Sequence, residues 1–189
     1  MTAMSLGFPN VLATDHMGPH IILVGISGSG KTTVGTMVAE RLGRVFMDLD
    51  REIEKREQAT VSELFAEKGE PYFRTKEREL TEELSKMGNM VLAPGGGWIT
   101  NADVVALLRP PGRIIYLKVK PETALKRLGD QRATRPLLSR PDPLGELKRF
   151  LADREDLYSQ ADHVLSTEVL DVKRVVDKLA ELASTIKGG

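Results

Sequence analysis

The chain has 189 residues, of which 41% are hydrophobic and 29% are charged, enough apolar material for one compact domain with a buried core. Its 27 lysines and arginines balance its 27 aspartates and glutamates, which argues against a general attraction to nucleic acid or to an acidic membrane. The absence of cysteine excludes disulfides, thiolate zinc sites and cysteine nucleophiles.

The first 19 residues have no basic start followed by an apolar core, so they do not resemble a signal peptide, and we expect a flexible extension. No apolar run in the chain approaches the roughly 20 residues that a membrane-spanning helix needs. We therefore expect a cytoplasmic protein with no membrane partner, in which residues 20–189 form a single domain.

Apolar segments with strand character alternate with helical patterns along this domain. The sequence predicts strands at 20–24, 44–48, 90–93, 113–119 and 163–165. It predicts helices at 31–42, 51–57, 60–87 with a break at 69, 101–108, from 121 onward, and 171–186. Short apolar strands separated by helices are typical of a parallel sheet covered on both faces. We therefore expect an α/β fold.

The segment Gly25-Ile-Ser-Gly-Ser-Gly-Lys-Thr32 fits the pattern G-x-x-x-x-G-K-[ST] between a predicted strand and a predicted helix. Backbone amides of such a loop, together with the start of the helix, surround phosphate oxygens. Lys31 would reach the β- and γ-phosphates of a nucleotide, and the Thr32 hydroxyl would bind Mg²⁺. The pattern predicts a nucleotide phosphate-binding loop.

The stretch Phe46-Met-Asp-Leu-Asp50 has two interpretations. Asp50 could cap the helix beginning at Arg51 while Asp48 is solvated. Alternatively, the two carboxylates face the same way, as in an extended strand, and serve a cation or a hydroxylated ligand. The third strand ends without a carboxylate, which argues against a motor ATPase and leaves Asp48 best placed to supply the second acid of a Mg²⁺ site. The chain also lacks the Asn-Lys-x-Asp sequence of a GTPase.

Three consecutive glycines, 95–97, follow the third strand at its carboxyl end, where ligands bind in open α/β sheets. They could donate amides to a ligand or simply form a tight turn. Arg74 and Glu77 are spaced for an ion pair on one helix, which could hold the guanidinium for a ligand or remain a surface pair. Six arginines between 127 and 154 surround a segment rich in glycine and proline, typical of a mobile lid or of a disordered basic loop.

Taken in order, the motifs GISGSGKTTVG, FMDLD, FRTKE, PGGG, RPLL and REDLY resemble those of shikimate kinases. The resemblance runs from about Ile21 to the C-terminus. It implies a three-layer P-loop kinase fold with a five-stranded parallel sheet in the order 2-3-1-4-5 and a mobile lid at about 129–145. It also implies transfer of the ATP γ-phosphate to the 3-hydroxyl of shikimate, with Mg²⁺, in a monomeric enzyme.

The same resemblance implies roles for individual residues. Asp50 would hold the shikimate hydroxyls, including the one attacked, and Arg74 and Arg154 would grip the carboxylate. The implied catalytic residues are Lys31, Asp50 and Arg135. The implied ATP contacts are Gly28, Ser29, Gly30, Lys31, Thr32, Thr33, Arg127 and Arg135. The further shikimate contacts are Phe65, Phe73, Gly96 and Gly97, and the implied metal-binding residues are Thr32 and Asp48.

Trp98 departs from the small residue usual in this family, and we expect it to narrow the mouth of the substrate site. Two alternatives remain open: a related small-molecule kinase such as a gluconate kinase, and a catalytically silent nucleotide-binding module. The combination of FRxxE, GGG and RxxLY favours shikimate over gluconate. The presence of Lys31, Thr32, Asp48 and Asp50 together argues against a silent module.

Overall fold

The computed structural model describes residues 18–129, 138, 140–168 and 171–185. The strands are β1 (Ile21–Val24), β2 (Val45–Asp48), β3 (Met90–Ala93), β4 (Arg113–Lys118) and β5 (His163–Ser166). They form one parallel sheet in the order β2-β3-β1-β4-β5, which confirms the implied topology. Most of the expected extension at 1–19 and of the expected lid at about 129–145, including Arg135, falls outside the described residues.

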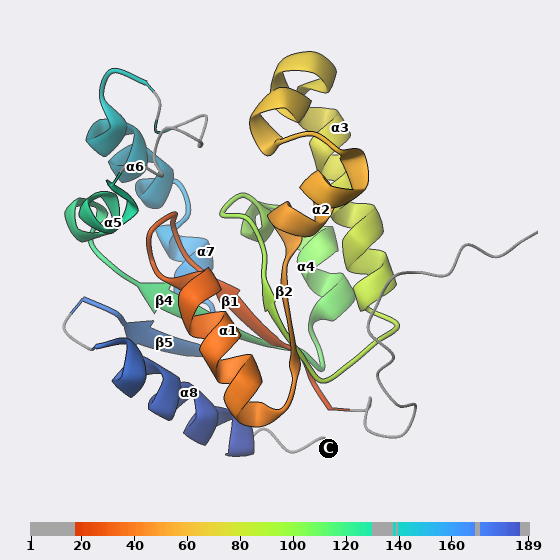
Figure 1. Cartoon of the computed structure of the whole chain (residues 1–189), viewed down its shortest axis with the longest axis vertical. Coiled ribbons are helices and arrows are strands. Elements are labelled where there is room, and N and C mark those ends of the chain that lie inside the picture. Colours follow the sequence, from red (N-terminus) through yellow and green to blue (C-terminus); the bar gives the residue numbers. More distant parts are fainter. Residues whose placement is uncertain (1–17, 130–137, 139, 169–170, 186–189) are drawn as a thin grey trace, which may run out of the picture.

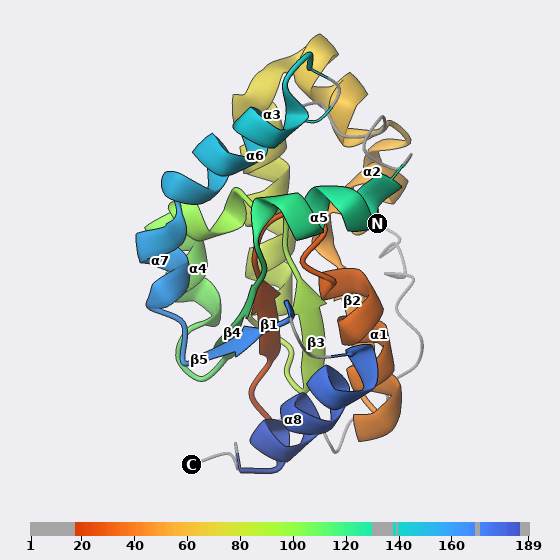
Figure 2. The same cartoon turned by 90° about the vertical axis from the view of Figure 1, so that its left-hand side faces the viewer.

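Helices cover both faces of this sheet and extend beyond one end of it (Figure 1). They are α1 (Lys31–Leu42), α2 (Leu49–Glu57), α3 (Val61–Leu84), the 3₁₀ helix η1 (Trp98–Thr100), α4 (Ala102–Leu108), α5 (Pro121–Leu128), α6 (Pro143–Ala152), α7 (Glu155–Ser159) and α8 (Val172–Thr185). In Figure 1, α2 and α3 rise beyond the sheet on one side, and α5 and α6 do so on the other. In Figure 2, all four helices lie beyond the same end of the sheet.

Alternating strand residues build two hydrophobic cores, one on each face of the sheet. Ile21 and Leu23 of β1 belong to the core that α1 and α8 complete. Ile22 and Val24 belong to the core on the opposite face, to which α3 and α4 contribute. All four side chains are at most 3% exposed, as expected for a central parallel strand with helices on both sides.

Local signals place most of the helices where the sequence predicts them. Thr60 and Glu63 form a capping box at the start of α3, and Gly69 interrupts that helix with φ 82° and ψ 162°. Of the two interpretations of 46–50, the one in which Asp50 caps the following helix is wrong, because α2 begins at Leu49 and its N-cap is Asp48. Asp48 Oδ1 accepts a hydrogen bond of 3.3 Å from the Arg51 amide.

Helices α6 and α7 are the α-helices that the sequence does not predict. The abundance of glycine and proline before them suggests a loop, yet Pro143 occupies the first turn of α6, where a missing amide hydrogen costs little. Asp142 caps this helix by accepting a 2.8 Å hydrogen bond from the Gly145 amide. The last residues of the expected lid therefore belong to α6.

The carboxyl ends of β2 and β3 lie side by side, because Asp48 pairs in register with Ala93. The β3–β1 pairing continues this alignment across the sheet, with Leu92 opposite Ile22. The loops that follow β1, β2 and β3 therefore leave the same edge of the sheet. These loops carry the glycine-rich phosphate-binding pattern, the start of α2 and the three consecutive glycines.

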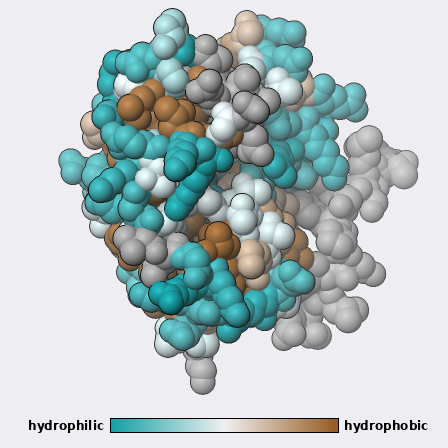
Figure 3. Space-filling model, turned by 60° about the vertical axis from the view of Figure 1, so that its left-hand side comes forward, coloured by the Kyte–Doolittle hydropathy of each residue, from teal (hydrophilic) through white to brown (hydrophobic). Residues whose placement is uncertain are grey.

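Hydrophilic side chains cover most of the described surface visible in Figure 3, and the hydrophobic residues there form small separate patches. Isolated apolar residues are normal on a protein surface and do not by themselves indicate a partner. Among the described residues, none of the helices combines the length and the hydropathy that crossing a lipid bilayer requires.

Candidate active site

The phosphate-binding loop lies between β1 and α1, as its sequence pattern requires. Gly30 is the N-cap of α1 and has φ 98°, a left-handed conformation that glycine adopts without strain. Lys31 Nζ donates hydrogen bonds to the carbonyl oxygens of Gly25 (2.7 Å) and Ile26 (3.2 Å), so its ammonium group lies over the loop. The Ser29 side chain is buried, and that of Thr33 is exposed on the first turn of α1.

Thr32 and Asp48 come together at the edge of the sheet. The Thr32 hydroxyl donates a 2.8 Å hydrogen bond to Asp48 Oδ2. Mg²⁺ prefers oxygen ligands and commonly uses one or two protein oxygens together with substrate phosphates and water. One hydroxyl and one carboxylate beside the phosphate-binding loop therefore fit this metal. Among the described residues, three or more acidic, histidine or cysteine side chains do not cluster elsewhere into a competing metal site.

Asp50 lies in the first turn of α2 and faces the three-glycine loop. A β-carbon placed at Gly95 would lie 2.5 Å from Asp50 Oδ1, so only glycine allows this approach. Asp48 and Asp50 thus serve different places. The helical turn that begins at Leu49 directs Asp48 towards Thr32 and Asp50 towards the glycine loop.

Arg74 is held by two carboxylates of its own helix. Its Nη1 donates to Glu77 Oε2 and its Nη2 donates to Glu70 Oε1, both over 2.9 Å. The Glu77 side chain is only 1% exposed, and its Oε1 has no hydrogen-bond partner among the described residues. Burial raises the pKa of Glu77 to about 7 against the opposing effect of Arg74, and the nearby Asp50 adds to the increase.

The guanidinium group of Arg74 also lies against the glycine loop. A β-carbon at Gly97 would overlap the Arg74 guanidinium atoms, so the backbone and the charged group are in close contact. The adjacent Phe73 is buried and meets Phe65 edge to face, with ring centroids 5.1 Å apart. The structure therefore places both phenylalanines next to Arg74, and they form an apolar surface beside its charge.

Arg154 packs on Phe150, which in turn contacts the glycine loop. Its guanidinium carbon lies 3.7 Å from the centroid of the Phe150 ring, and its Nη1 donates to the Phe150 carbonyl over 3.1 Å. The Phe150 Cζ atom would lie 2.8 Å from a β-carbon at Gly96. Arg154 is 18% exposed, and its Nε is buried without a hydrogen-bond partner among the described residues.

Arg127 lies near the end of α5, away from the glycine loop. Its Nη2 donates to the Thr167 carbonyl over 2.7 Å, and its Nη1 donates to the Thr167 hydroxyl over 3.2 Å. The Thr167 hydroxyl in turn lies 3.4 Å from the Ser29 carbonyl oxygen. This arrangement connects Arg127 to the phosphate-binding loop through the residue that follows β5.

Trp98 does not narrow a substrate mouth, contrary to the expectation from sequence. Its side chain is fully buried, and the indole Nε1 donates a 3.3 Å hydrogen bond to the Thr81 hydroxyl. The 3₁₀ turn after the glycine loop directs the ring into the core beneath α3. A large residue is accommodated there because it fills core volume rather than the ligand side of the loop.

Phe150 and Tyr158 are site neighbours to which the sequence assigns no role. Phe150 contacts Gly96, and the Tyr158 hydroxyl donates a 3.0 Å hydrogen bond to the Gly96 carbonyl oxygen. Tyr158 belongs to the REDLY motif, which offers a signal for it. The only sequence signal for Phe150 is that it lies about one helical turn before Arg154.

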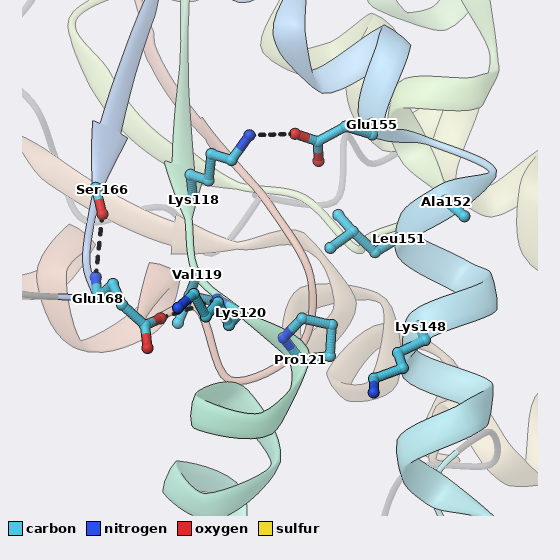
Figure 4. A pocket seen from close by; sticks show the side chains of 10 residues that line it. All are labelled: Lys118, Val119, Lys120, Pro121, Lys148, Leu151, Ala152, Glu155, Ser166 and Glu168. Carbon is cyan, nitrogen blue, oxygen red and sulfur yellow. Dashed lines mark hydrogen bonds and ion pairs between the residues drawn. The ribbon is translucent and has the colours of Figure 1, made fainter.

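A separate groove of about 700 Å³ lies beside the ends of β4 and β5 (Figure 4). It is lined by Lys118, Val119, Lys120, Pro121, Lys148, Leu151, Ala152, Glu155, Ser166 and Glu168. Lys118 donates to Glu155 over 2.5 Å, and Lys148 pairs with Glu122 over 2.7 Å, so these charges are locally balanced. The groove includes none of the site residues expected from sequence, and we assign no step of a reaction to it.

Comparisons with known proteins point to one family. Residues 27–184 match the family model described as shikimate kinase. A curated shikimate kinase from Symbiobacterium thermophilum is 43% identical over 164 residues, which cover 86% of this chain and 94% of the relative. Another from Caldicellulosiruptor saccharolyticus is 38% identical, with coverage of 86% and 94%.

A solved structure gives the same result. The shikimate kinase from Acinetobacter baumannii, in complex with shikimate, superimposes with a TM-score of 0.83 at 38% identity. The match covers 89% of this chain and 94% of that protein.

Proposed function

The chain belongs to the shikimate kinase family, and we propose that its site transfers the γ-phosphate of ATP to the 3-hydroxyl of shikimate, giving shikimate 3-phosphate and ADP. One observation carries this assignment of residues: Asp50, Arg74 and the Arg154–Phe150 pair converge on three consecutive glycines beside the phosphate-binding loop. A hydroxylated carboxylic acid needs a hydroxyl acceptor and paired guanidinium groups, and the residues around this loop supply both.

Arg74 and Arg154 bind the shikimate carboxylate in this proposal. A guanidinium group matches the planar carboxylate with two parallel hydrogen bonds, which a lysine cannot do. Glu77 and Glu70 fix the orientation of Arg74 before the substrate arrives. Phe65 and Phe73 provide the apolar surface beneath the ring, and the amides of Gly96 and Gly97 contact its polar groups.

Asp50 orients the attacked hydroxyl and accepts its proton. An ordinary aspartate carboxylate is far too weak a base to remove a proton from an alcohol before the new bond begins to form. Phosphoryl transfer passes through a loose transition state, so early deprotonation is not needed. Positioning the hydroxyl in line with the γ-phosphate is therefore the larger contribution of Asp50, and proton acceptance follows late.

ATP is held by residues 28–33 and by Arg127. Lys31 leaves the loop carbonyl oxygens that it now contacts and binds the phosphate oxygens, where it offsets the charge that develops during transfer. Thr32 and Asp48 would hold Mg²⁺, Asp48 through water, and the bound metal would supply further charge neutralisation at the phosphates. Arg135, which lies outside the described residues, is the third catalytic residue of this proposal and would bind the phosphates.

The proposal further describes residues 20–189 as one kinase domain that acts as a monomer in the cytoplasm. On the face drawn in Figure 3, the described residues form only small separate apolar patches, which supports the monomeric part of this proposal for that face. The gluconate kinase and silent-module alternatives are not favoured, because the relatives that match most of the chain are shikimate kinases.

The test is ADP release from ATP and Mg²⁺ with shikimate, with gluconate, or with no acceptor. We expect ADP release with shikimate only. Equal release with gluconate would make the protein a less selective small-molecule kinase. If the protein binds ATP but releases no ADP with either acid, a catalytically silent nucleotide-binding module would become the favoured function.

A further inference from the structure

We propose that two buried aromatic residues, Tyr158 and Trp98, are positioning residues that set the place of the glycine loop between Arg74 and Arg154. This inference rests on the proposed function, because it concerns the same shikimate-binding site. Each aromatic side chain is fully buried and donates one hydrogen bond, and the two bonds attach the loop to different helices. Together they fix the loop from both sides.

Tyr158 attaches the loop to α7. Its hydroxyl donates a 3.0 Å hydrogen bond to the Gly96 carbonyl oxygen, and its ring is fully buried. The ring stacks on Tyr116 with centroids 4.9 Å apart and an interplanar angle of 20°. The Tyr158 amide also donates to the Arg154 carbonyl over 2.9 Å, so one helical turn separates the loop contact from the arginine. Tyr158 therefore sets the distance between Arg154 and the loop.

The hydrogen bond to Gly96 also orients the next peptide group. The peptide bond between Gly96 and Gly97 is trans, so the Gly97 N–H points opposite to the Gly96 carbonyl. Fixing the carbonyl towards Tyr158 fixes that N–H away from α7. Within the described part of the chain the Gly97 amide has no hydrogen-bond acceptor. A polar group of the substrate can therefore accept from it.

Trp98 attaches the other end of the loop to α3. Its indole Nε1 donates over 3.3 Å to the Thr81 hydroxyl, which itself donates over 2.7 Å to the Glu77 carbonyl oxygen. The Trp98 backbone amide donates to the Gly95 carbonyl over 3.1 Å and closes the turn around the loop. Arg74 and Glu77 lie on the same helix as Thr81, so the indole fixes the loop relative to the Arg74 guanidinium.

These two attachments matter because the contacts with the loop are close on every side. Arg74 touches Gly97, Phe150 touches Gly96 and Asp50 touches Gly95, each at a place where a β-carbon would not fit. A shift of the loop by an ångström would change the separation of both guanidinium groups from the loop amides. Misplacement of this size strongly affects binding and catalysis in enzymes. We therefore expect the loss of either hydrogen bond to weaken shikimate binding specifically.

Two pairs of variants test the inference. Tyr158→Phe removes only the hydroxyl that reaches the loop, and Tyr116→Phe is its matched control, because the Tyr116 hydroxyl bonds to Glu155 instead. Thr81→Val removes the acceptor of the Trp98 indole while keeping the side-chain shape, and Thr81→Ser restores a hydroxyl. The measurements are KM for shikimate, KM for ATP and the thermal unfolding midpoint of each variant.

We expect Tyr158→Phe and Thr81→Val each to raise the shikimate KM by about threefold to tenfold, the effect of one lost buried hydrogen bond, with the ATP KM unchanged. Tyr116→Phe and Thr81→Ser should keep the wild-type shikimate KM. A merely structural role would lower the unfolding midpoint and leave the KM ratio unaltered. Emission from Trp98, the single tryptophan of the chain, gives a second binding readout in all four variants.

An unchanged shikimate KM in Tyr158→Phe and Thr81→Val, or equal increases for both substrates, would overturn the inference while the wild type remains an active shikimate kinase. If Tyr158→Phe does not fold, the comparison of Thr81→Val with Thr81→Ser decides the question. A wild-type protein that does not phosphorylate shikimate would instead overturn the proposed function, and the two failures are therefore distinct.

Discussion

The Thr32 hydroxyl donates a 2.8 Å hydrogen bond to Asp48 Oδ2, which joins the start of α1 to the end of β2. The two residues are 16 positions apart in the chain and meet because β1 and β2 end at the same edge of the sheet. Asp48 serves a second purpose as the N-cap of α2. In the proposed function, this one carboxylate would therefore act on the metal through water and also cap a helix.

The Asp48→Asn variant should therefore separate the proposed metal-binding role of Asp48 from its role as the N-cap of α2. The asparagine oxygen can still accept from the Arg51 amide, and its NH2 group can donate to the Thr32 hydroxyl oxygen, so the fold should be retained. Loss of the charge should raise the Mg²⁺ concentration for half-maximal activity by about 10-fold or more, as expected when a group that acts on the metal through water is removed. A Mg²⁺ titration of the initial rate measures this. An unchanged requirement for Mg²⁺ would remove Asp48 from the metal site.

Arg154→Ala should raise the shikimate KM by at least about 10-fold, because a charge-assisted contact to the substrate carboxylate contributes about 1.5–3 kcal/mol. The ATP KM should stay near the wild-type value. Arg149→Ala is the matched control, since Arg149 lies on α6, is 63% exposed and pairs with Glu146. Similar effects of Arg154→Ala on both substrates would contradict a role in carboxylate binding.

Arg74→Ala should both abolish tight shikimate binding and destabilise the fold. Glu77 is 1% exposed, so losing its partner leaves a buried carboxylate without a counter-charge, which costs several kcal/mol. Adding Glu77→Gln to Arg74→Ala should restore part of the unfolding free energy, because a neutral amide is less costly to bury. It should not restore shikimate binding. Chemical denaturation and calorimetric titration of the single and double variants measure the two properties separately.

Recovery of shikimate binding in the double variant would show that Arg74 acts only as the partner of Glu77. The Glu77→Gln single variant provides the remaining corner of the cycle. The coupling energy between Glu77 and Arg74 is then the change in unfolding free energy in the double variant minus the sum of the changes in the two single variants.

The candidate site could be located from the sequence because the motifs lie directly after the predicted strands. Residues after the carboxyl ends of adjacent parallel strands must meet, so the phosphate-binding loop, Asp48, Asp50 and the glycine loop could be placed together before any coordinates. The different directions of Asp48 and Asp50 could not, because the chain turns helical at Leu49 instead of staying extended, which would have made both carboxylates face the same way. Side-chain direction reverses with that one change of backbone conformation.

Trp98, Phe150 and Tyr158 show a second reason why the rest of the site could not be predicted. Aromatic residues are usual in cores, and apart from the place of Tyr158 in the REDLY motif nothing local distinguishes a core aromatic from one that touches a ligand loop. Phe150 and Tyr158 meet Gly96 across more than 50 residues of sequence. Their contact follows from α6 and α7, the two helices that composition suggests least.

His20 gives a prediction for stability at acidic pH. It is buried, its Nδ1 accepts a 3.4 Å hydrogen bond from the Met90 amide, and its Nε2 lies 3.0 Å from the Leu84 carbonyl oxygen. Burial lowers the pKa of His20 below its ordinary 6.5, and Arg44 adds to this effect. The unfolded chain therefore binds the proton more readily, so His20 stabilises the fold above pH 6.5 and this contribution is lost as the pH falls.

His20→Gln should flatten this dependence, because glutamine offers a donor and an acceptor but does not titrate in this range. The unfolding free energy of the wild type should fall more than that of the variant between pH 7 and pH 5. Urea denaturation at several pH values measures both. If the unfolding free energies of the two proteins fall in parallel with pH, other groups cause the loss of stability at acidic pH.

The turnover of Asp50→Asn tests the central claim most directly. Asparagine keeps the shape at Gly95 but cannot accept the proton of the shikimate hydroxyl. We predict that shikimate-dependent ADP release falls by about 100-fold or more, the usual contribution of a positioned base, while ATP binding measured by calorimetry is unchanged. Near-normal turnover in this variant would contradict the account and would require a different residue to receive the substrate hydroxyl.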